Sequence, residues 1–483
     1  MALPFKGCHM KILLTFIFAL YYTCTLGQAH NISAGYQKPE DPLVIKNLED
    51  WQDLKFGLFM HWGTYSQWGI VESWSLCPED EGWTQRKKEH GASYYEYVKN
   101  YENLQKTFNP IQFNPQKWAK AAKAAGMQYV VFTTKHHDGF AMFDTKESDY
   151  KITDPKTPFS THPKANITKE IFEAFRQENF KIGAYFSKPD WHSEYYWWPY
   201  FPPKDRNVNY DPQKYPDRWE KFKQYTFNQI NELTTNYGKI DILWLDGGWV
   251  RPLSTVDTTV DWQKTIKLEQ DIDMDRIGSM ARKNQPGIII VDRTVPGKWE
   301  NYVTPEQSIP EQPLHIPWES CITMGDSFSY VPNDNYKPTK TIIETLVKII
   351  SRGGNYLLNI APGPNGDFDP IAYERLEQLT PWININKSAI FSTRTIYPYH
   401  KDSYYYTRSK DSKHINVFHL SEGETYQQPS LYRFEIAPEQ SIQDIKLLGY
   451  RGKLKWKKDK LIITIIPPDH KIEYVAVFQI TVK

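Results

Sequence analysis

Residues 240–249 read Ile-Asp-Ile-Leu-Trp-Leu-Asp-Gly-Gly-Trp, a mostly apolar run that stops at a carboxylate followed by two glycines. A nearly continuous apolar run with a turn signal at its end is typical of a parallel-sheet strand buried on both faces. Asp246 ends this run, at the position where open sheets and barrels place their ligands. We therefore predict a strand over 240–245 and take Asp246 as the first candidate for a chemically active group.

Strand-like and helix-like runs alternate on both sides of this stretch. The other strand-like runs lie at 56–61, 129–134, 181–186, 287–291 and 356–360. Amphipathic stretches that predict helices lie between them, at 115–126, 169–180, 219–236 and 339–352. Repeated alternation implies a parallel sheet, and its extent of roughly 300 residues favours a distorted (β/α)8-like barrel over an open doubly wound sheet. No glycine-rich phosphate loop follows the first strand, which weakens a nucleotide-binding fold further.

The pattern of the sequence changes after about Ser388. Polar and apolar residues then alternate in runs separated by turn-forming residues, at 404–420, 430–436 and 454–466. This texture is typical of an antiparallel β-sandwich. We predict a barrel domain over residues 30–387 and a C-terminal β-sandwich domain over 388–483.

The N-terminus carries the signature of a targeting segment. Lys11 precedes an apolar run over 12–22, and small or polar residues follow. This run is too short to span a bilayer, so we predict a cleaved secretory signal peptide over residues 1–29 and no membrane anchor in the mature chain. Three sequons predict glycosylation in the secretory pathway, at Asn31, Asn166 and Asn386. The mature chain keeps two cysteines, Cys77 and Cys321, which either form one bridge or stay reduced.

The composition narrows the class of ligand. The formal net charge of +1 implies no broad attraction to nucleic acid or to an acidic membrane surface. Aromatic residues make up 15% of the chain, with 17 Trp and 32 Tyr. Such rings stack on sugar faces in carbohydrate-binding proteins, and they also pack in the cores of large proteins. Composition alone leaves these two readings open.

Polar side chains follow several of the predicted strands. His61 ends the first, His136 and His137 the second, and Arg293 follows the strand after Asp246. Because strand ends of a barrel meet at one mouth, these residues predict a shared pocket. Adjacent histidines on a strand point to opposite faces and lack a metal-ligand spacing, so we expect hydrogen bonds to hydroxyl groups rather than a metal site. One of the two is open to a second reading, as a histidine buried in the core.

Five segments together resemble the α-L-fucosidases of glycoside hydrolase family 29. They are 56–63 (FGLFMHWG), 133–140 (TTKHHDGF), 244–247 (WLDG), 318–324 (WESCITM) and 357–362 (LLNIAP). The resemblance runs from about Trp51 to Ile396 in the family's order, and the weaker C-terminal region fits the family's β-sandwich. It implies a retaining hydrolase of terminal α-L-fucosides that needs no cofactor or metal.

The resemblance also implies roles for carboxylates. The family's nucleophile is the Asp of the W-x-D-G motif, here Asp246, which attacks the anomeric carbon and forms a covalent glycosyl-enzyme. A carboxylic acid about 5–5.5 Å away protonates the departing oxygen and then activates water. The family's acid/base lies on a variable loop, and the resemblance places it at Glu306. Glu319 is the second choice, better suited to a supporting role, and Glu311 is the third.

Substrate-binding residues are implied one position at a time. Glu72 and Trp74 resemble the family's Glu-Trp pair, although Ser73 is inserted between them here. The full set expected to contact fucose is His61, Glu72, Trp74, His136, His137, Tyr185, Trp244, Trp249 and Arg293. A hydrophobic slot for the C6 methyl group of fucose would add modest selectivity.

The partners implied are fucosylated oligosaccharides, glycoproteins or glycolipids, and no nucleic acid or membrane. The family also leaves homo-oligomers open. The signal and the sequons suit a secreted or a lysosomal protein equally. Two other hypotheses stay open at this point: a catalytically weak or inactive, lectin-like fucose binder, and a glycosidase for another sugar on the same fold.

Overall fold

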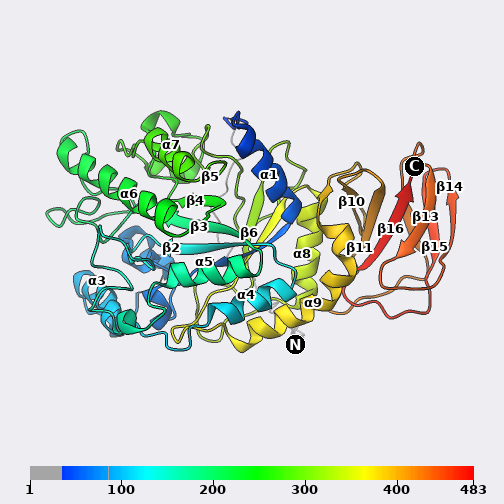
Figure 1. The fold of residues 1–483 in the computed structure, drawn as a ribbon, viewed down its shortest axis with the longest axis horizontal. Coiled ribbons are helices and arrows are strands. Elements are labelled where there is room, and N and C mark those ends of the chain that lie inside the picture. The colour runs from blue at the N-terminus through cyan, green and yellow to red at the C-terminus, as the bar shows by residue number, and fades with distance from the viewer. Residues whose placement is uncertain (1–34, 85) are drawn as a thin grey trace, which may run out of the picture.

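The computed structural model describes residues 35–84 and 86–483. Seven parallel strands form the central sheet, in the order β5-β4-β3-β2-β1-β7-β6. Their bounds are β1 Phe56–Met60, β2 Tyr129–Lys135, β3 Lys181–Ser187, β4 Ile242–Asp246, β5 Ile289–Asp292, β6 Glu319–Thr323 and β7 Asn355–Asn359. The sheet curls into a barrel-like form, as the alternation of strands and helices predicted, with the C-terminal strands at one end of the molecule (Figure 1).

The opening between the edge strands β5 and β6 is bridged by an irregular segment, residues 299–307, which we call the closing segment. Its first part meets β5, where Asn301 N donates to Ile290 O (2.9 Å). Its second part meets β6, where Glu319 N donates to Val303 O (3.0 Å). In the described part of the chain, no helix lies between β5 and β6, and this is where the fold departs from a regular (β/α)8 barrel.

Helices cover the outer face of the sheet, as expected where strands are buried on both faces (Figure 1). The four predicted helices, α4, α5, α6 and α8, are present within a few residues of their expected bounds. Four further helices, α1, α3, α7 and α9, were not predicted. All eight are α1 Pro42–Leu54, α3 Tyr94–Glu102, α4 Pro115–Ala124, α5 Ile167–Gln177, α6 Pro216–Asn236, α7 Met274–Asn284, α8 Thr339–Ser351 and α9 Pro370–Ile390. A short helix, α2, spans Glu81–Thr84.

The inside of the barrel is filled by a separate apolar cluster. It includes Phe59, Tyr129, Val131, Ile242 and Trp244, all buried. Helix α1 adds Trp51, which stacks on Tyr302 with ring centroids 4.1 Å apart. Side chains of a strand alternate between its two faces, so the residue two positions after an inward apolar side chain also points inward. Asp246, the last residue of β4, follows Trp244 in this way. His61 lies one residue beyond β1, with its ring centroid 4.4 Å from that of Phe59.

The C-terminal region forms two antiparallel sheets. One contains β8 Thr393–Arg394, β9 His400–Lys401, β10 Tyr404–Ser409, β11 His414–His419, β13 Ile442–Leu447 and β16 Ala476–Val482. The other contains β12 Tyr432–Glu435, β14 Lys455–Asp459 and β15 Ile462–Ile466. Buried side chains of both sheets share one core, the arrangement of a β-sandwich. Helix α9 ends at Ile390, a few residues beyond the predicted domain boundary.

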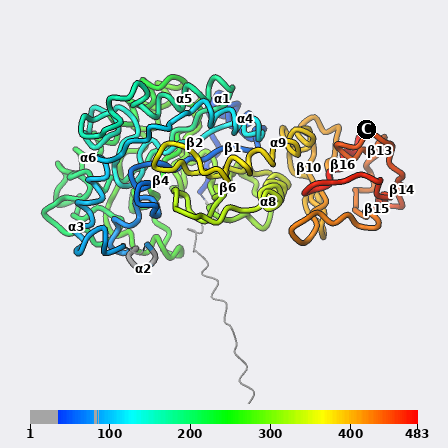
Figure 2. The backbone as a smooth tube through the Cα atoms, turned by 90° about the horizontal axis from the view of Figure 1, so that it is seen from below, coloured from blue at the N-terminus to red at the C-terminus, as the bar shows by residue number. Residues whose placement is uncertain are grey.

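The sandwich packs against the barrel domain through α8 and α9, as both views show (Figures 1 and 2). Trp382 of α9 donates its Nε1 hydrogen to Val475 O (3.1 Å). Side chains of the sandwich, Tyr405, Phe418 and Val477 among them, belong to the same apolar cluster as the outer layer of the barrel. The two domains therefore share a continuous core.

Three sequence-based predictions concern the N-terminus and the cysteines. The signal peptide over 1–29 and the sequon at Asn31 lie outside the described residues. Cys77 and Cys321 are both buried and do not form a disulfide bridge with each other. Within residues 35–84 and 86–483, no helix combines the length and apolar character that crossing a bilayer requires.

Candidate active site

Asp246 is the last residue of β4 and lies at the carboxyl ends of the parallel strands. Its Oδ2 atom accepts a hydrogen bond from the Tyr185 hydroxyl (2.9 Å), and its Oδ1 atom accepts one from Arg293 Nη1 (3.1 Å). His137 Nε2 lies 3.8 Å from Oδ2. A carboxylate with fixed partners on both oxygens has its orientation determined, which is what an attacking group requires.

The glycine after Asp246 is required by the turn. Gly247 has φ +88, and a Cβ atom there would lie 2.2 Å from Pro189 Cδ. The chain leaves the strand at once, and Lys188 N donates to the Asp246 carbonyl oxygen (2.9 Å). The Asp-Gly pair noted in the sequence thus places the carboxylate at the rim of the barrel instead of continuing the strand.

The charge of Asp246 is set by its neighbours. Burial favours the neutral acid, but the Arg293 guanidinium outweighs it and holds the pKa of Asp246 far below its usual range. In turn, although burial disfavours the cation, Glu306 and Asp246 raise the pKa of Arg293. Asp246 is therefore ionised at any physiological pH, as an anionic nucleophile must be.

Glu306 lies on the closing segment, beside the same arginine. Arg293 Nη2 contacts Glu306 Oε2, and Arg293 Nε donates to Thr304 Oγ1 (3.0 Å). The backbone around Glu306 is fixed to β6, because Gln307 N donates to Cys321 O (3.0 Å) and Cys321 N donates to Pro305 O (3.1 Å). One guanidinium thus contacts both Asp246 and Glu306, so the two carboxyl groups lie on either side of Arg293.

Glu319 occupies a different place. It is the first residue of β6, at the opposite end of that strand from the mouth, and it is fully buried. Its carboxyl group accepts hydrogen bonds from Tyr129 OH (2.5 Å), Tyr302 OH (3.2 Å) and Trp244 Nε1 (3.3 Å). Burial raises the pKa of Glu319 to about 7. Glu311, the third candidate, is exposed.

The three histidines gather beside Asp246. Strand β2 ends at Lys135, so His136 and His137 lie beyond it and do not alternate between two faces, as we had expected for a strand. Both are buried, with ring centroids 4.2 Å apart. His61 donates through Nδ1 to Asn359 Oδ1 (2.8 Å), which leaves its Nε2 as an acceptor. Burial lowers the pKa of His61 to about 4 and that of His137 to about 3, so both rings are neutral.

Two buried groups of the site have no hydrogen-bond partner among the described residues. They are both ring nitrogens of His137 and the Oε1 atom of Glu72. Burial raises the pKa of Glu72 to about 8, so this carboxyl group is neutral in the free protein and able to donate. Buried polar atoms without a partner in a native structure call for a specific explanation, and a polyhydroxylated ligand supplies one.

The inserted Ser73 has a role of its own. Its Oγ atom lies 2.6 Å from His136 Nδ1, and Asp138 N donates to it (3.0 Å). The insertion therefore ties the segment after β1 to the segment after β2. Sequence reasoning treated Ser73 only as a departure from the family pattern, and it also missed Asn359, although that residue stands within the quoted motif 357–362.

Aromatic rings form the remaining wall of the site. Trp74 and Trp249 lie with ring centroids 5.1 Å and 5.0 Å from that of His137. Trp244 lies beneath, stacked on Tyr185 at 5.3 Å, with the Arg293 guanidinium 5.0 Å from its ring centre. The nine residues expected to contact substrate thus lie toward one end of the barrel, with Tyr185 and Trp244, which are register neighbours on β3 and β4, one layer deeper than Asp246.

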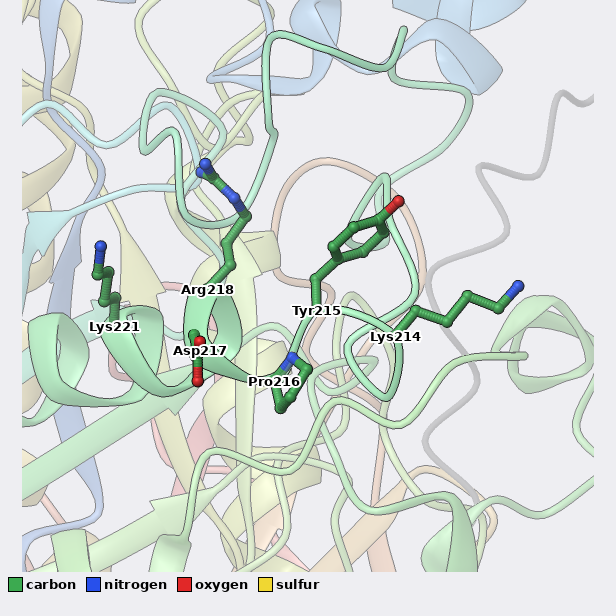
Figure 3. A pocket seen from close by; sticks show the side chains of 6 residues that line it. All are labelled: Lys214, Tyr215, Pro216, Asp217, Arg218 and Lys221. Carbon is green, nitrogen blue, oxygen red and sulfur yellow. The ribbon is translucent and has the colours of Figure 1, made fainter.

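A separate pocket of about 310 Å³ lies at the start of α6 (Figure 3). Its lining contains none of the residues above: it is formed by Lys214, Tyr215, Pro216, Asp217, Arg218 and Lys221. Within the described residues, no three His, Cys, Asp or Glu side chains are grouped as ligands for a metal ion.

The two described sequons differ in their surroundings. Asn166 is the N-cap of α5 and is half-buried, with its Nδ2 donating to Tyr237 OH (3.1 Å). Asn386 is buried within α9, and its Nδ2 donates to Trp382 O (2.8 Å). Because a glycan is attached through that nitrogen and needs space at the surface, the structure does not favour glycosylation at Asn386.

Two carboxyl groups lie at the mouth of a (β/α) barrel, one of them ionised and both in contact with the same arginine. Neutral histidines and tryptophans surround them. This combination of fold and site is that of a glycoside hydrolase. Comparison with known proteins agrees. A family model described as Alpha-L-fucosidase matches residues 23–388, and the chain belongs to the α-L-fucosidase family.

Named relatives cover nearly the whole chain. Tissue alpha-L-fucosidase of Rattus norvegicus is 28% identical over 91% of this chain and 91% of its own length. Tissue alpha-L-fucosidase of Homo sapiens is 27% identical over 86% of this chain and 84% of its own length. Plasma alpha-L-fucosidase of Homo sapiens is 25% identical over 86% of this chain and 85% of its own length.

Solved structures share the fold. Alpha-L-fucosidase isoenzyme 1 from Paenibacillus thiaminolyticus superposes with a TM-score of 0.72 at 24% identity, covering 91% of this chain and all of the other. A second structure is a family 29 enzyme from Bacteroides thetaiotaomicron, described as a trapped covalent intermediate with 2-fluoro-fucosyl fluoride. It superposes with a TM-score of 0.71 at 21% identity, covering 93% of this chain and 98% of the other.

Proposed function

We propose that this protein is a retaining exo-glycosidase that releases terminal α-L-fucose from glycoconjugates, with Asp246 as nucleophile and Glu306 as acid/base. The observation that carries the proposal is the Arg293 guanidinium, which touches Asp246 Oδ1 and Glu306 Oε2 together. Two carboxyl groups held to one guanidinium suit the spacing of about 5–5.5 Å that retaining glycosidases use.

In the first step, Asp246 attacks the anomeric carbon while Glu306 gives a proton to the departing oxygen. The carbon–oxygen bond to the aglycone breaks and a fucosyl ester of Asp246 forms. In the second step, Glu306 takes a proton from water, the water oxygen attacks the anomeric carbon, and Asp246 leaves as a carboxylate. A trapped covalent intermediate described for the Bacteroides relative supports this double displacement.

Charge changes at Asp246 help Glu306 to alternate between acid and base. Before reaction, the anionic Asp246 disfavours a second negative charge on Glu306, which supports its protonated form. The ester has no charge, so Arg293 then acts on Glu306 alone and favours its ionised, basic form. The alternation follows from the shared arginine without any change in the fold.

The neutral side chains around Asp246 suit a sugar with several hydroxyl groups. His61, His137 and Glu72 offer buried acceptors and donors, and Trp74 and Trp249 offer apolar ring faces. A wall assembled from several strand ends suits the recognition of one terminal sugar residue, which supports an exo-acting enzyme. With both carboxyl groups and their partners in place, we set aside the lectin-like alternative.

The test is substitution of the nucleophile. We expect Asp246→Gly to lower turnover of an aryl α-L-fucoside by at least about 10³-fold, because the covalent step is lost. Added azide should then enter the space and yield β-fucosyl azide, identified by NMR. Asp241→Asn, at the other end of the same strand stretch, serves as the control and should keep its activity. Unchanged activity of Asp246→Gly, or a preference of the wild type for an aryl galactoside, would refute the proposal.

The expected substrates are fucosylated oligosaccharides, glycoproteins or glycolipids, and the expected destination is the lysosome or the cell exterior. The name of the plasma relative supports the cell exterior. Expression in a eukaryotic cell, followed by N-terminal sequencing of the secreted chain, would test the cleavage after residue 29.

A further inference from the structure

Arg206 lies on the long segment between β3 and α6, where nothing in the sequence pattern marked it out. Its guanidinium carbon lies 4.9 Å from the ring centre of Trp74 and 5.5 Å from that of Trp249. The side chain also forms an ion pair with Glu79, and only 17% of it is exposed. Arg206 is thus a packed cation with three defined neighbours, not a solvated surface charge.

The two tryptophans connect Arg206 to the sugar pocket. Their rings lie 5.7 Å apart, and each also lies against His137. His137 Nε2 in turn lies 3.8 Å from Asp246 Oδ2. Moving outward from Asp246, the order is therefore His137, the two indole rings and then Arg206.

The backbone of Arg206 is fixed by the same aromatic wall. Its carbonyl oxygen accepts hydrogen bonds from Tyr196 OH (3.0 Å) and Trp191 Nε1 (3.3 Å). The Tyr196 hydroxyl also accepts one from Trp249 Nε1 (3.1 Å). The guanidinium position is therefore set before any ligand arrives.

Three separate loops meet at this point. Trp74 and Glu79 follow β1, Arg206 follows β3, and Trp249 follows β4. Attraction between a cation and an indole face strengthens where water is excluded, and a planar guanidinium can lie against a ring as an ammonium group cannot. Arg206 links its own loop to the other two, through Trp74 and Glu79 on one side and Trp249 on the other.

We propose that Arg206 is a positioning residue for substrate: it holds Trp74 and Trp249 against His137 and so fixes the wall of the pocket on the Oδ2 side of Asp246. This inference rests on the proposed function, because it assigns the wall to fucose binding. Since Arg206 acts on the wall and not on the reacting atoms, its loss should weaken binding of the sugar in the ground state and the transition state alike.

The test compares Arg206→Met with a matched control in the same part of the chain. Arg206→Met keeps the length and apolar stem of the side chain and removes the charge. The control is Arg218→Met, because Arg218 also lies over an indole ring, 4.2 Å from the centre of Trp198, but lines the separate pocket at the start of α6 (Figure 3). Glu79→Gln and Arg206→Lys complete the series.

We expect Arg206→Met to raise KM for an aryl α-L-fucoside about tenfold and to change kcat less than threefold, the scale of one desolvated cation–π contact. The dissociation constant of L-fucose, measured by calorimetry, should rise by the same factor. Arg206→Lys and Glu79→Gln should give intermediate values, and Arg218→Met should stay within twofold of the wild type.

Three results would overturn the inference. They are an Arg206→Met variant within twofold of wild type in both KM and fucose affinity, a loss confined to kcat, and an equal loss in Arg218→Met. Thermal unfolding of each variant separates a binding effect from partial unfolding, and Arg206→Lys carries the test if Arg206→Met does not fold. Failure of the wild type to hydrolyse the fucoside would refute the proposed function alone, since fucose calorimetry tests Arg206 without turnover.

Discussion

Arg293 contacts both carboxyl groups that meet at the mouth of the barrel, and it keeps Asp246 ionised. With Asp246 and Glu306 both ionised, the three side chains together carry one negative charge. Adding one proton makes the group neutral, and the geometry gives that proton to Glu306 because Arg293 holds the pKa of Asp246 far below its usual range. In the proposed mechanism, this arginine therefore distinguishes the nucleophile from the acid/base.

Glu306 can be separated from Glu319 by the product formed with an added nucleophile. We expect Glu306→Ala to lose at least about 10²-fold in kcat/KM for a disaccharide and much less for an aryl fucoside, whose leaving group needs little protonation. Azide should intercept the fucosyl ester and give α-fucosyl azide, detected by NMR. Glu319→Ala, compared under the same conditions, should give no azide product. The reverse pattern would assign the acid/base to Glu319.

Glu319 should also make stability depend on pH. Burial raises its pKa from the ordinary 4.5 to about 7, so the folded state favours the neutral acid. Its contribution is fully present below pH 4.5, is lost as pH rises from 4.5 to about 7, and is then constant. The loss is about 3 kcal/mol, at 1.36 kcal/mol for each pKa unit.

Glu319→Gln removes this titration and keeps the shape of the neutral acid. Urea unfolding of both proteins at pH 5 and pH 8 measures the effect. The wild type should lose more stability than Glu319→Gln between these two values, by about 2–3 kcal/mol, slightly less than the full loss because part of it occurs below pH 5. Glu72, whose pKa burial also raises, titrates in both proteins and cancels in the comparison. Equal losses would contradict a neutral Glu319.

At the scale of elements, strands with continuous apolar runs could be predicted from the sequence, whereas β6, which mixes polar and apolar residues, could not. β4 was predicted from its sequence because Ile, Leu and Trp bury both faces. β6 was missed because it reads Glu-Ser-Cys-Ile-Thr, with polar side chains that find partners only inside the folded barrel. Glu319, for example, is satisfied by three donors from β2, β4 and the closing segment, which no local pattern reveals.

Some residues of the candidate site could be predicted from the sequence and others could not. Asp246 and the histidines were found because they directly follow recognisable strands. Ser73 and Arg206 lie on loops, and they reach the site by contacts with distant residues, His136 and Trp249 among them. The sequence also suggested that His136 and His137 point apart, which holds only within a strand, and β2 ends one residue earlier.

Close packing between β1 and β2 gives a prediction for the barrel interior. A Cβ atom at Gly57 would lie 2.4 Å from Tyr129 Cζ, and Tyr129 donates to Glu319. Gly57→Ala should therefore displace the Tyr129 ring and lower the free energy of unfolding by about 1–3 kcal/mol. Denaturant unfolding measures this. Gly82→Ala is the matched control, since an added Cβ there meets no atom of the described residues within 4 Å. A Gly57→Ala variant as stable as the control would mean that the barrel interior is less tightly packed.

At the scale of the whole molecule, the shared core predicts that the barrel and the sandwich unfold together. Trp382 lies in α9 between them and is 5% exposed. Trp382→Ala should cost about 3–5 kcal/mol and lower the midpoint of a single calorimetric transition. Two transitions, of which only one shifts, would show that the domains unfold independently.

The closing segment has a consequence for how such a protein can change over evolutionary time. β4 is paired on both sides, so Asp246 cannot move without disturbing the sheet. Glu306 lies on the closing segment, which is held to β6 by backbone hydrogen bonds, and in the described part of the chain no helix lies between β5 and β6. If Glu306 is the proton donor and Asp246 the nucleophile, as proposed, insertions or deletions in the closing segment would shift the donor to suit a new leaving group without moving Asp246. Asp246, on a strand paired on both sides, is therefore expected to keep its position, whereas Glu306, on the closing segment, is expected to vary in position.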